Sequence, residues 1–176
     1  MTTERSHVAL EPLARGALAL VLAVVVTFSP DHSPAVGLTV FGGWSLLTGL
    51  ALLLTSRRTR SLWSLAHGAA AVSAGLVAIG VLVLASGAAP QTLVPLLAGF
   101  AAVSGALDIA SGIRGTAGRD GVVVGSASVL LALLVLGFPA DPVFTVGLLG
   151  AWAAVVGVYL VIGALSVPET RKAHSA

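Results

Sequence analysis

The stretch LVPLLAGFAAVSGALDIASGIRG, residues 93–115, is a long apolar run with one carboxylate, Asp108, well inside it. Small and polar residues recur beside this carboxylate at helical spacing, at Ser104, Gly105, Ser111 and Gly112. A helix that crosses a bilayer needs roughly 20 mostly apolar residues. The stretch therefore predicts a membrane helix, and parts of its pattern occur once before it and once after it.

The composition of the whole chain agrees with a membrane protein. Of its 176 residues, 57% are hydrophobic and 9% are charged, whereas soluble domains usually carry about 25% charged residues. Because so few charges could not cover a soluble surface, we expect the apolar surface to face the lipid bilayer. The net charge of +2 indicates no nucleic-acid partner. The absence of cysteine excludes disulfides and metal sites with cysteine ligands.

Six apolar segments follow one another, at about 13–28, 35–55, 62–86, 92–113, 121–138 and 143–165. Strands fit poorly, because the runs are long and lack alternation. Prolines mark three of the breaks, and proline ends helices by removing a backbone donor. We therefore expect an all-α membrane protein, with an N-terminal tail at 1–12, a six-helix domain at 13–167 and a C-terminal tail at 168–176.

The basic residues predict the orientation. With six spans, all nine fall on one side of the membrane: Arg5, Arg15, Arg57, Arg58, Arg60, Arg114, Arg119, Arg171 and Lys172. The opposite loops hold no lysine or arginine. By the positive-inside rule, both termini are cytoplasmic. A cleaved signal peptide in the first run is a less favoured alternative, because its removal would destroy the repeat described next.

A pattern of proline, aromatic and glycine, spaced by ten and then five residues, occurs three times. The copies are Pro34–Trp44–Gly49, Pro90–Phe100–Gly105 and Pro142–Trp152–Gly157. The preceding helices also match, with a polar residue before glycine at Arg15-Gly16, His67-Gly68 and Asp120-Gly121. We expect three tandem helical hairpins, at about 13–60, 62–115 and 118–167, related by rotation about the membrane normal.

These hairpins resemble the HdeD-type acid-resistance membrane proteins. The resemblance extends over about residues 13–167 and rests on GGWSLLTG at 42–49, AGFAAVSGALDIASG at 98–112 and AWAAVVGVYLVIGA at 151–164. An acidic residue in the fourth helix, here Asp108, is typical of that family as well. The resemblance implies a protein of the bacterial inner membrane linked to survival in acid. It implies no reaction.

Asp108 needs partners if it lies inside a membrane, because an aspartate at a helix centre costs about 2.5–3.5 kcal/mol. From their depth in neighbouring segments, we expect His67 or Arg15 to satisfy it, with Ser104 and Ser111 adding local hydrogen bonds. One interpretation makes Asp108 a site for a proton or cation. The favoured interpretation is a polar clamp between helices, because no second carboxylate lies deep enough to form a relay.

The opposite loops contain the only other set of titratable residues that could respond to external acid: Asp31, His32 and Asp141. Histidine is the side chain that changes charge near neutral pH. A solvated loop histidine is the simpler interpretation, and we favour it.

Three aromatic residues occupy matching positions near the middle of the membrane, at Trp44, Phe100 and Trp152. They could surround a central constriction, or they could fill the space left by the neighbouring glycines Gly49, Gly105 and Gly157. We favour packing. Glycines at helical spacing suit close helix contacts within a chain or between chains, so a homo-oligomer stays open.

No sequence pattern indicates catalysis. The chain has no phosphate-binding loop, no nucleophile elbow, no paired carboxylates and no histidine pair with metal-ligand spacing. We therefore expect no cofactor, no metal and no enzymatic activity, and protein partners stay unknown. The favoured function is support of envelope tolerance to acid stress. The alternative is a small channel or transporter for protons or a small solute, with Asp108 as the titratable site. An intramembrane enzyme is the least favoured interpretation.

Overall fold

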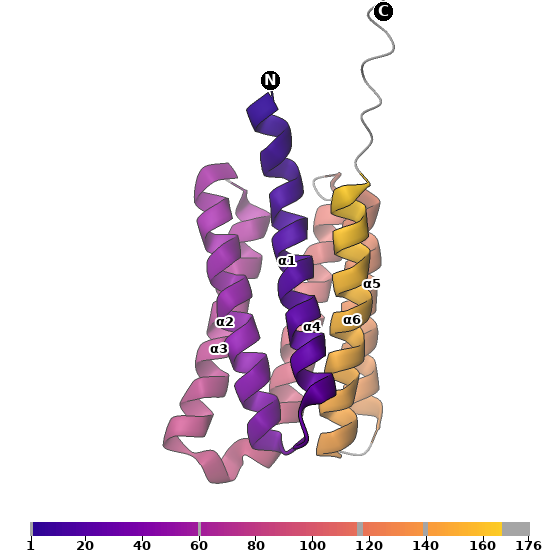
Figure 1. Cartoon of the computed structure of the whole chain (residues 1–176). Helices are drawn as coiled ribbons and strands as arrows, with labels where there is room; N and C mark the ends of the chain where they lie inside the picture. The colour runs from indigo at the N-terminus through magenta and orange to yellow at the C-terminus, as the bar shows by residue number, and fades with distance from the viewer. Residues whose placement is uncertain (1, 60, 116–117, 139–140, 167–176) are drawn as a thin grey trace, which may run out of the picture.

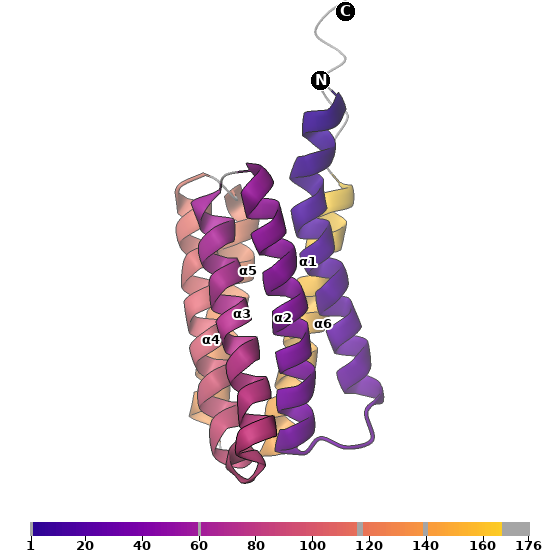
Figure 2. The ribbon, with the colours of Figure 1, turned by 90° about the vertical axis from the view of Figure 1, so that its left-hand side faces the viewer.

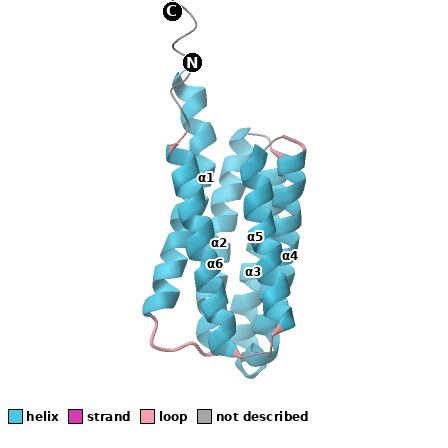
Figure 3. Cartoon of the chain, turned by 90° about the vertical axis from the view of Figure 1, so that its right-hand side faces the viewer, coloured by secondary structure: helices cyan, strands magenta, loops and turns pink. Residues whose placement is uncertain are grey.

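The computed structural model describes residues 2–59, 61–115, 118–138 and 141–166. Within these ranges the chain forms six long α-helices and no strand (Figures 1 and 3). The helices are α1 (Thr2–Phe28), α2 (Pro34–Thr59), α3 (Leu62–Leu84), α4 (Ala89–Ile113), α5 (Gly118–Gly137) and α6 (Pro142–Leu165), with a short 3₁₀ turn, η1 (Ser86–Ala88), before α4. All six are long and apolar enough to cross a membrane. The predicted all-α class is confirmed, and the helices indicate a multi-pass membrane protein.

The first helix begins earlier than the sequence predicts. The polar residues expected as a tail are helical from Thr2 onward, and the helix continues through Pro12. Glutamate, arginine, alanine and leucine in this stretch are good helix formers, so the lack of apolar residues does not prevent a helix there. The predicted tail at 168–176, together with Arg60, lies outside the described residues.

The helix starts show why the prolines mark the breaks. Pro142 lies in the first turn of α6, and Asp141 caps that helix by accepting a hydrogen bond from the Val143 backbone N–H at 2.8 Å. The Ser61 side chain caps α3 in the same way. Proline suits the first turn, because its missing N–H would have no partner inside the helix.

The helices pack most closely as α2 with α3, α4 with α5, and α6 with α1. Glycine makes this possible at the centre of each pair, because a Cβ atom there would collide with the opposite backbone. Equivalent close approaches occur in the three pairs, at Gly49 to Gly68, Gly105 to Gly125, and Gly157 to Gly16. Each pair therefore joins the second helix of one hairpin to the first helix of the next. The contact between α6 and α1 closes the ring (Figures 1 and 2).

The pair of α4 and α5 corrects one detail of the sequence repeat. Gly125 packs against Gly105, whereas the repeat pattern matched Gly121 to Gly16 and Gly68. The position that corresponds to Arg15 and His67 is therefore the buried Val124, one helical turn beyond Asp120. Asp120 is exposed and accepts a hydrogen bond from the Tyr159 hydroxyl at 2.8 Å. The third hairpin thus adds no charged residue beside Arg15 and His67.

The start of α1 and the end of α6 lie at the same end of the bundle (Figure 1). Because each helix reverses the chain direction, the end of α2 and the end of α4 lie there too, and with them Arg57 and Arg114. The Arg114 guanidinium lies 5.0 Å from the centre of the Trp63 ring, a cation–π contact. The exposed arginines that the structure describes, Arg57, Arg114 and Arg119, thus lie at one end of the bundle.

Candidate functional site

The charged centre of the bundle is an ion pair between α1 and α4. Arg15 donates two hydrogen bonds to Asp108, from Nη1 to Oδ1 at 3.2 Å and from Nη2 to Oδ2 at 2.9 Å. The Asp108 side chain is 7% exposed and that of Arg15 is 20% exposed. A buried carboxylate is tolerated only when it is paired, and the planar guanidinium matches its two oxygens. This geometry accounts for an aspartate inside an apolar helix.

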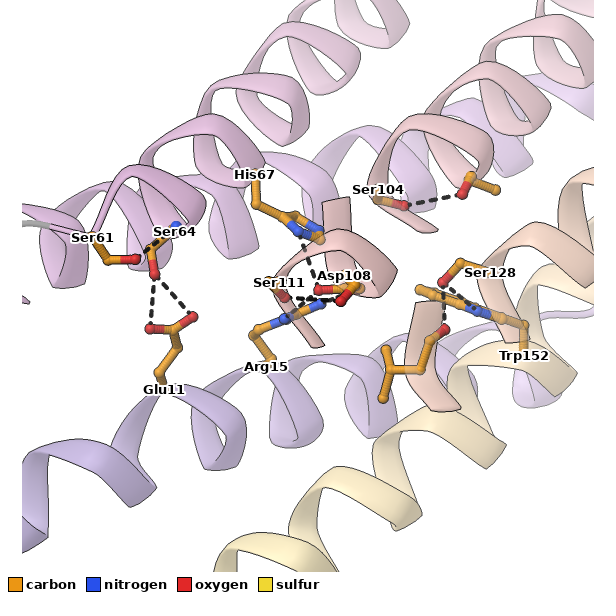
Figure 4. A network of polar contacts seen from close by, with 12 residues as sticks. Glu11, Arg15, Ser61, Ser64, His67, Ser104, Asp108, Ser111, Ser128 and Trp152 are labelled. Atoms are coloured by element: carbon orange, nitrogen blue, oxygen red, sulfur yellow. Dashed lines mark hydrogen bonds and ion pairs between the residues drawn. The ribbon is translucent and has the colours of Figure 1, made fainter. Parts of the chain in front are cut away.

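His67 contacts the same carboxylate from α3. Its Nδ1 lies 3.4 Å from Asp108 Oδ1, and its side chain is 8% exposed (Figure 4). The sequence suggested His67 or Arg15 as the partner of Asp108, and the structure places both there. The carboxylate therefore connects three helices, α1, α3 and α4.

The two serines that flank Asp108 bond mainly to the backbone of their own helix. Ser111 Oγ donates to the Asp108 backbone carbonyl at 2.8 Å. Ser104 Oγ donates to the Ala101 carbonyl at 3.3 Å. Serine in a membrane helix commonly bonds back to a carbonyl of the preceding turn, and both serines make such local bonds here.

A second polar contact holds α1 against α3, one helical turn from the ion pair. The Ser64 hydroxyl lies 3.0 Å from Glu11 Oε2 and 3.2 Å from Oε1 (Figure 4). Glu11 and Arg15 are four residues apart and so lie on one face of α1. This contact is not among those predicted from the sequence, although the spacing from Glu11 to Arg15 and from Ser64 to His67 places each pair on one helix face.

The repeated aromatic residues meet on the axis of the bundle. Trp44 packs edge-to-face on Phe100, with ring centres 5.8 Å apart, and on Trp152, with ring centres 5.5 Å apart. Such tilted contacts are the favourable arrangement for aromatic rings. The Trp152 indole also donates to Ser128 Oγ of α5 at 3.3 Å. The sequence left open whether these rings surround a constriction or pack, and the structure shows them packed on one another.

A small cavity lies between the aromatic rings and the ion pair. Its lining combines the triad Arg15, His67 and Asp108, the rings of Trp44, Phe100 and Trp152, and the hydroxyl-bearing residues Thr48, Ser104 and Ser128, with apolar residues of α1 and α6. Thr48 and Ser104 each follow the repeated aromatic by four residues. That shared spacing is a sequence signal for hydroxyl-bearing residues beside the aromatic rings.

Asp31 and Asp141, in the loops at the end of the bundle away from the exposed arginines, accept hydrogen bonds at the starts of helices. Asp31 is exposed and accepts hydrogen bonds from the Ser33 backbone N–H at 2.8 Å and its hydroxyl at 3.0 Å, just before α2. Asp141 caps α6, as described above. His32 is partly exposed. The structure therefore assigns both carboxylates a place in the turns that begin helices.

Across the part of the chain that the structure describes, no group of three histidine or acidic side chains is arranged to hold a metal ion. The polar cluster instead offers paired opposite charges at the wall of a small, mostly apolar cavity. Such a cluster can join helices, and it can bind a small hydrogen-bonding molecule.

Comparison with known proteins gives one match. Residues 14–85 match the family model described as a short repeat of unknown function (DUF308). No curated protein and no solved structure matches the chain. The matched residues extend from α1 to the end of α3, so they contain the first hairpin and the first helix of the second. The chain is therefore similar to a short repeat whose description assigns no activity.

Proposed function

We propose that the chain is an integral protein of a bacterial inner membrane, of the HdeD type, which supports the tolerance of the cell envelope to acid and is not an enzyme. The sequence resemblance supports this assignment. The match to a short repeat that HdeD-type families carry supports it further. Six helices that can cross a membrane are what such a protein requires.

The main support for a role without catalysis or transport is that the buried charges are already paired with one another. Asp108 already has Arg15 and His67 as partners, so its oxygens are engaged in joining helices. The aromatic rings of Trp44, Phe100 and Trp152 pack together on the axis. A bundle held in this way resembles a packed structural unit more than a pathway for ions.

Survival in acid tests the proposed role. We expect deletion of the gene in the source bacterium to lower survival after an acid challenge, and the wild-type gene on a plasmid to restore it. Asp108→Asn should restore survival less well than wild type, because it weakens the clamp. Asp141→Asn is the matched control, since it removes an exposed carboxylate. Equal survival of the deletion strain and its parent would reject the role.

The orientation with both termini in the cytoplasm is part of the same proposal, and the gathering of arginines at one end of the bundle supports it. Because the chain has no cysteine, single cysteines report cleanly on sidedness. In intact spheroplasts, a membrane-impermeant maleimide should label Pro30→Cys and not Ser166→Cys, whereas lysis should expose both. Labelling of Ser166→Cys in intact spheroplasts would contradict the orientation.

The second candidate is a small channel or transporter for protons or a small solute. The cavity that reaches Asp108 favours it. A pH jump across proteoliposomes separates the two candidates: we expect no more flux than in empty vesicles. Flux that starts on acidification and disappears in Asp108→Asn would establish the second candidate instead.

A further inference from the structure

Two residues that line the cavity, Thr48 and Trp44, each have a buried polar atom, Oγ1 and Nε1, with no hydrogen-bond partner among the described residues. Thr48 is 4% exposed and Trp44 is 9% exposed. Leaving a buried donor or acceptor without a partner costs about 1–3 kcal/mol. Two such groups on the wall of one cavity therefore indicate a ligand that satisfies them.

Thr48 differs in this respect from three other threonines of the membrane helices. Thr39, Thr55 and Thr92 each donate to the carbonyl four residues before them, at 2.8, 2.9 and 2.7 Å. This local bond is the usual way for threonine to satisfy its hydroxyl in an apolar helix. The Thr48 hydroxyl makes no such bond and lines the cavity instead.

The size of the cavity limits the ligand. The space open to the centre of a water molecule is about 20 Å³, and roughly 10–15 Å³ is enough for one water. A larger solute does not fit without movement of the aromatic rings. Although the lining is mostly apolar, its few polar side chains can supply the two to four partners that an internal water needs, since Ser104 also lines the cavity and its hydroxyl oxygen keeps lone pairs beyond its bond to Ala101.

We propose that this cavity is a binding site for an ordered water molecule, which accepts a hydrogen bond from Trp44 Nε1 and bonds to Thr48 Oγ1. The site lies between the aromatic rings and the Arg15–Asp108 pair, so the water extends the polar cluster toward the middle of the bundle. This inference concerns the interior of the protein and holds whether or not the chain acts in acid tolerance.

A pair of substitutions tests the site by the sign of their effect on stability. Thr48→Val keeps the volume of the side chain and removes its hydroxyl. Ser45→Ala is the matched control, because Ser45 Oγ is also buried without a partner but is not part of the cavity lining. We expect Thr48→Val to lower the Tm of the protein in detergent micelles by about 2–4 °C, the usual shift for one hydrogen bond in a protein of this size. Ser45→Ala should leave the Tm unchanged or raise it.

If the cavity is dry, both substitutions remove an unsatisfied hydroxyl and both raise the Tm. A rise for Thr48→Val overturns the proposal. An equal fall for both variants overturns it as well, because the effect would then be unrelated to the cavity.

Nuclear magnetic resonance of the unmodified protein gives a second test that needs no substitution. The three tryptophans, labelled with ¹⁵N, each show one indole N–H. Trp152 serves as the internal comparison, because its indole donates to Ser128. We expect magnetisation transfer from water to the Trp44 indole proton to be at least twofold stronger than to that of Trp152. Equal or weaker transfer at Trp44 overturns the proposal.

Discussion

The guanidinium of Arg15 in α1 and the carboxylate of Asp108 in α4 meet through two parallel hydrogen bonds, although 93 positions separate them in the chain. The pair ties the first hairpin to the second inside the apolar part of the bundle. His67 adds a third helix to the same carboxylate. Any substitution here therefore acts on how whole helices pack.

Removing one member of the pair should destabilise the protein strongly. We expect Asp108→Ala to lower the free energy of unfolding by about 3 kcal/mol, because it leaves the Arg15 charge buried without its partner. The double variant Arg15→Met with Asp108→Leu should recover most of that loss, since apolar side chains replace a buried ion pair at little cost. Denaturant titration in micelles measures all variants. Strictly additive effects of the two positions would show that they do not interact.

Gly105 should tolerate no side chain, because a Cβ atom there would lie 2.8 Å from the Gly125 carbonyl oxygen and 3.0 Å from the Val129 backbone nitrogen. We expect Gly105→Ala to destabilise the protein by about 1–3 kcal/mol, since the backbones of α4 and α5 must move apart. Gly99→Ala is the matched control in the same helix, because nothing lies within 4 Å of its Cβ position. That change should be neutral or stabilise by up to about 1 kcal/mol. Equal effects at both positions would contradict close packing of α4 on α5.

The contact between Glu11 and Ser64 should contribute to the position of α1. Ser64→Ala removes the hydroxyl that bonds both carboxylate oxygens. We expect a loss of about 1–2 kcal/mol, in the range for a hydrogen bond to a charged group. Ser73→Ala, on an exposed face of α3, should change stability by less than about 0.5 kcal/mol. If Ser64→Ala has no larger effect than Ser73→Ala, the contact does not hold α1 in place.

The aromatic cluster should depend on ring volume more than on the indole donor. Trp152→Ala leaves a cavity on the axis and should cost about 3–5 kcal/mol. Trp152→Phe keeps a smaller ring and loses the hydrogen bond to Ser128, so we expect a smaller loss of about 1–2 kcal/mol. Phe28→Ala, at a side chain that is 81% exposed, serves as the control for removing an aromatic ring. Thermal unfolding of the wild type and the three variants in micelles ranks their stabilities. A loss of stability for Trp152→Phe as large as for Trp152→Ala would contradict the prediction.

Much of the architecture follows from patterns that can be read along the chain. The apolar runs and their prolines predict six helices, and the ends differ from the structure by a few residues except at the start of α1. The depth of His67, Arg15 and Asp108 in their segments also predicted which side chains could meet. Depth alone did not decide between the two partners of Asp108, because it leaves the rotation of each helix open.

Other features of the site could not be predicted in this way. Ser104 lies one turn from Asp108 but bonds to its own helix, since a backbone carbonyl is nearer. The repeat pattern matched Gly121 where the structure uses Gly125, because the pattern looked for a polar residue before glycine, which Asp120-Gly121 has and Val124-Gly125 lacks. The unsatisfied Thr48 hydroxyl becomes visible only when the cavity beside it is known.

The sequence by itself determined the number of apolar helices, their order, and the gathering of the arginines at the end that carries both termini, because run length and charge position are properties of a single line of residues. Three dimensions were needed to show that α6 packs against α1, that Arg15 and His67 share Asp108, and that a small cavity lies between the aromatic rings and the ion pair. Those contacts depend on how each helix is rotated about its own axis, and close packing of glycines against opposite backbones fixes that rotation.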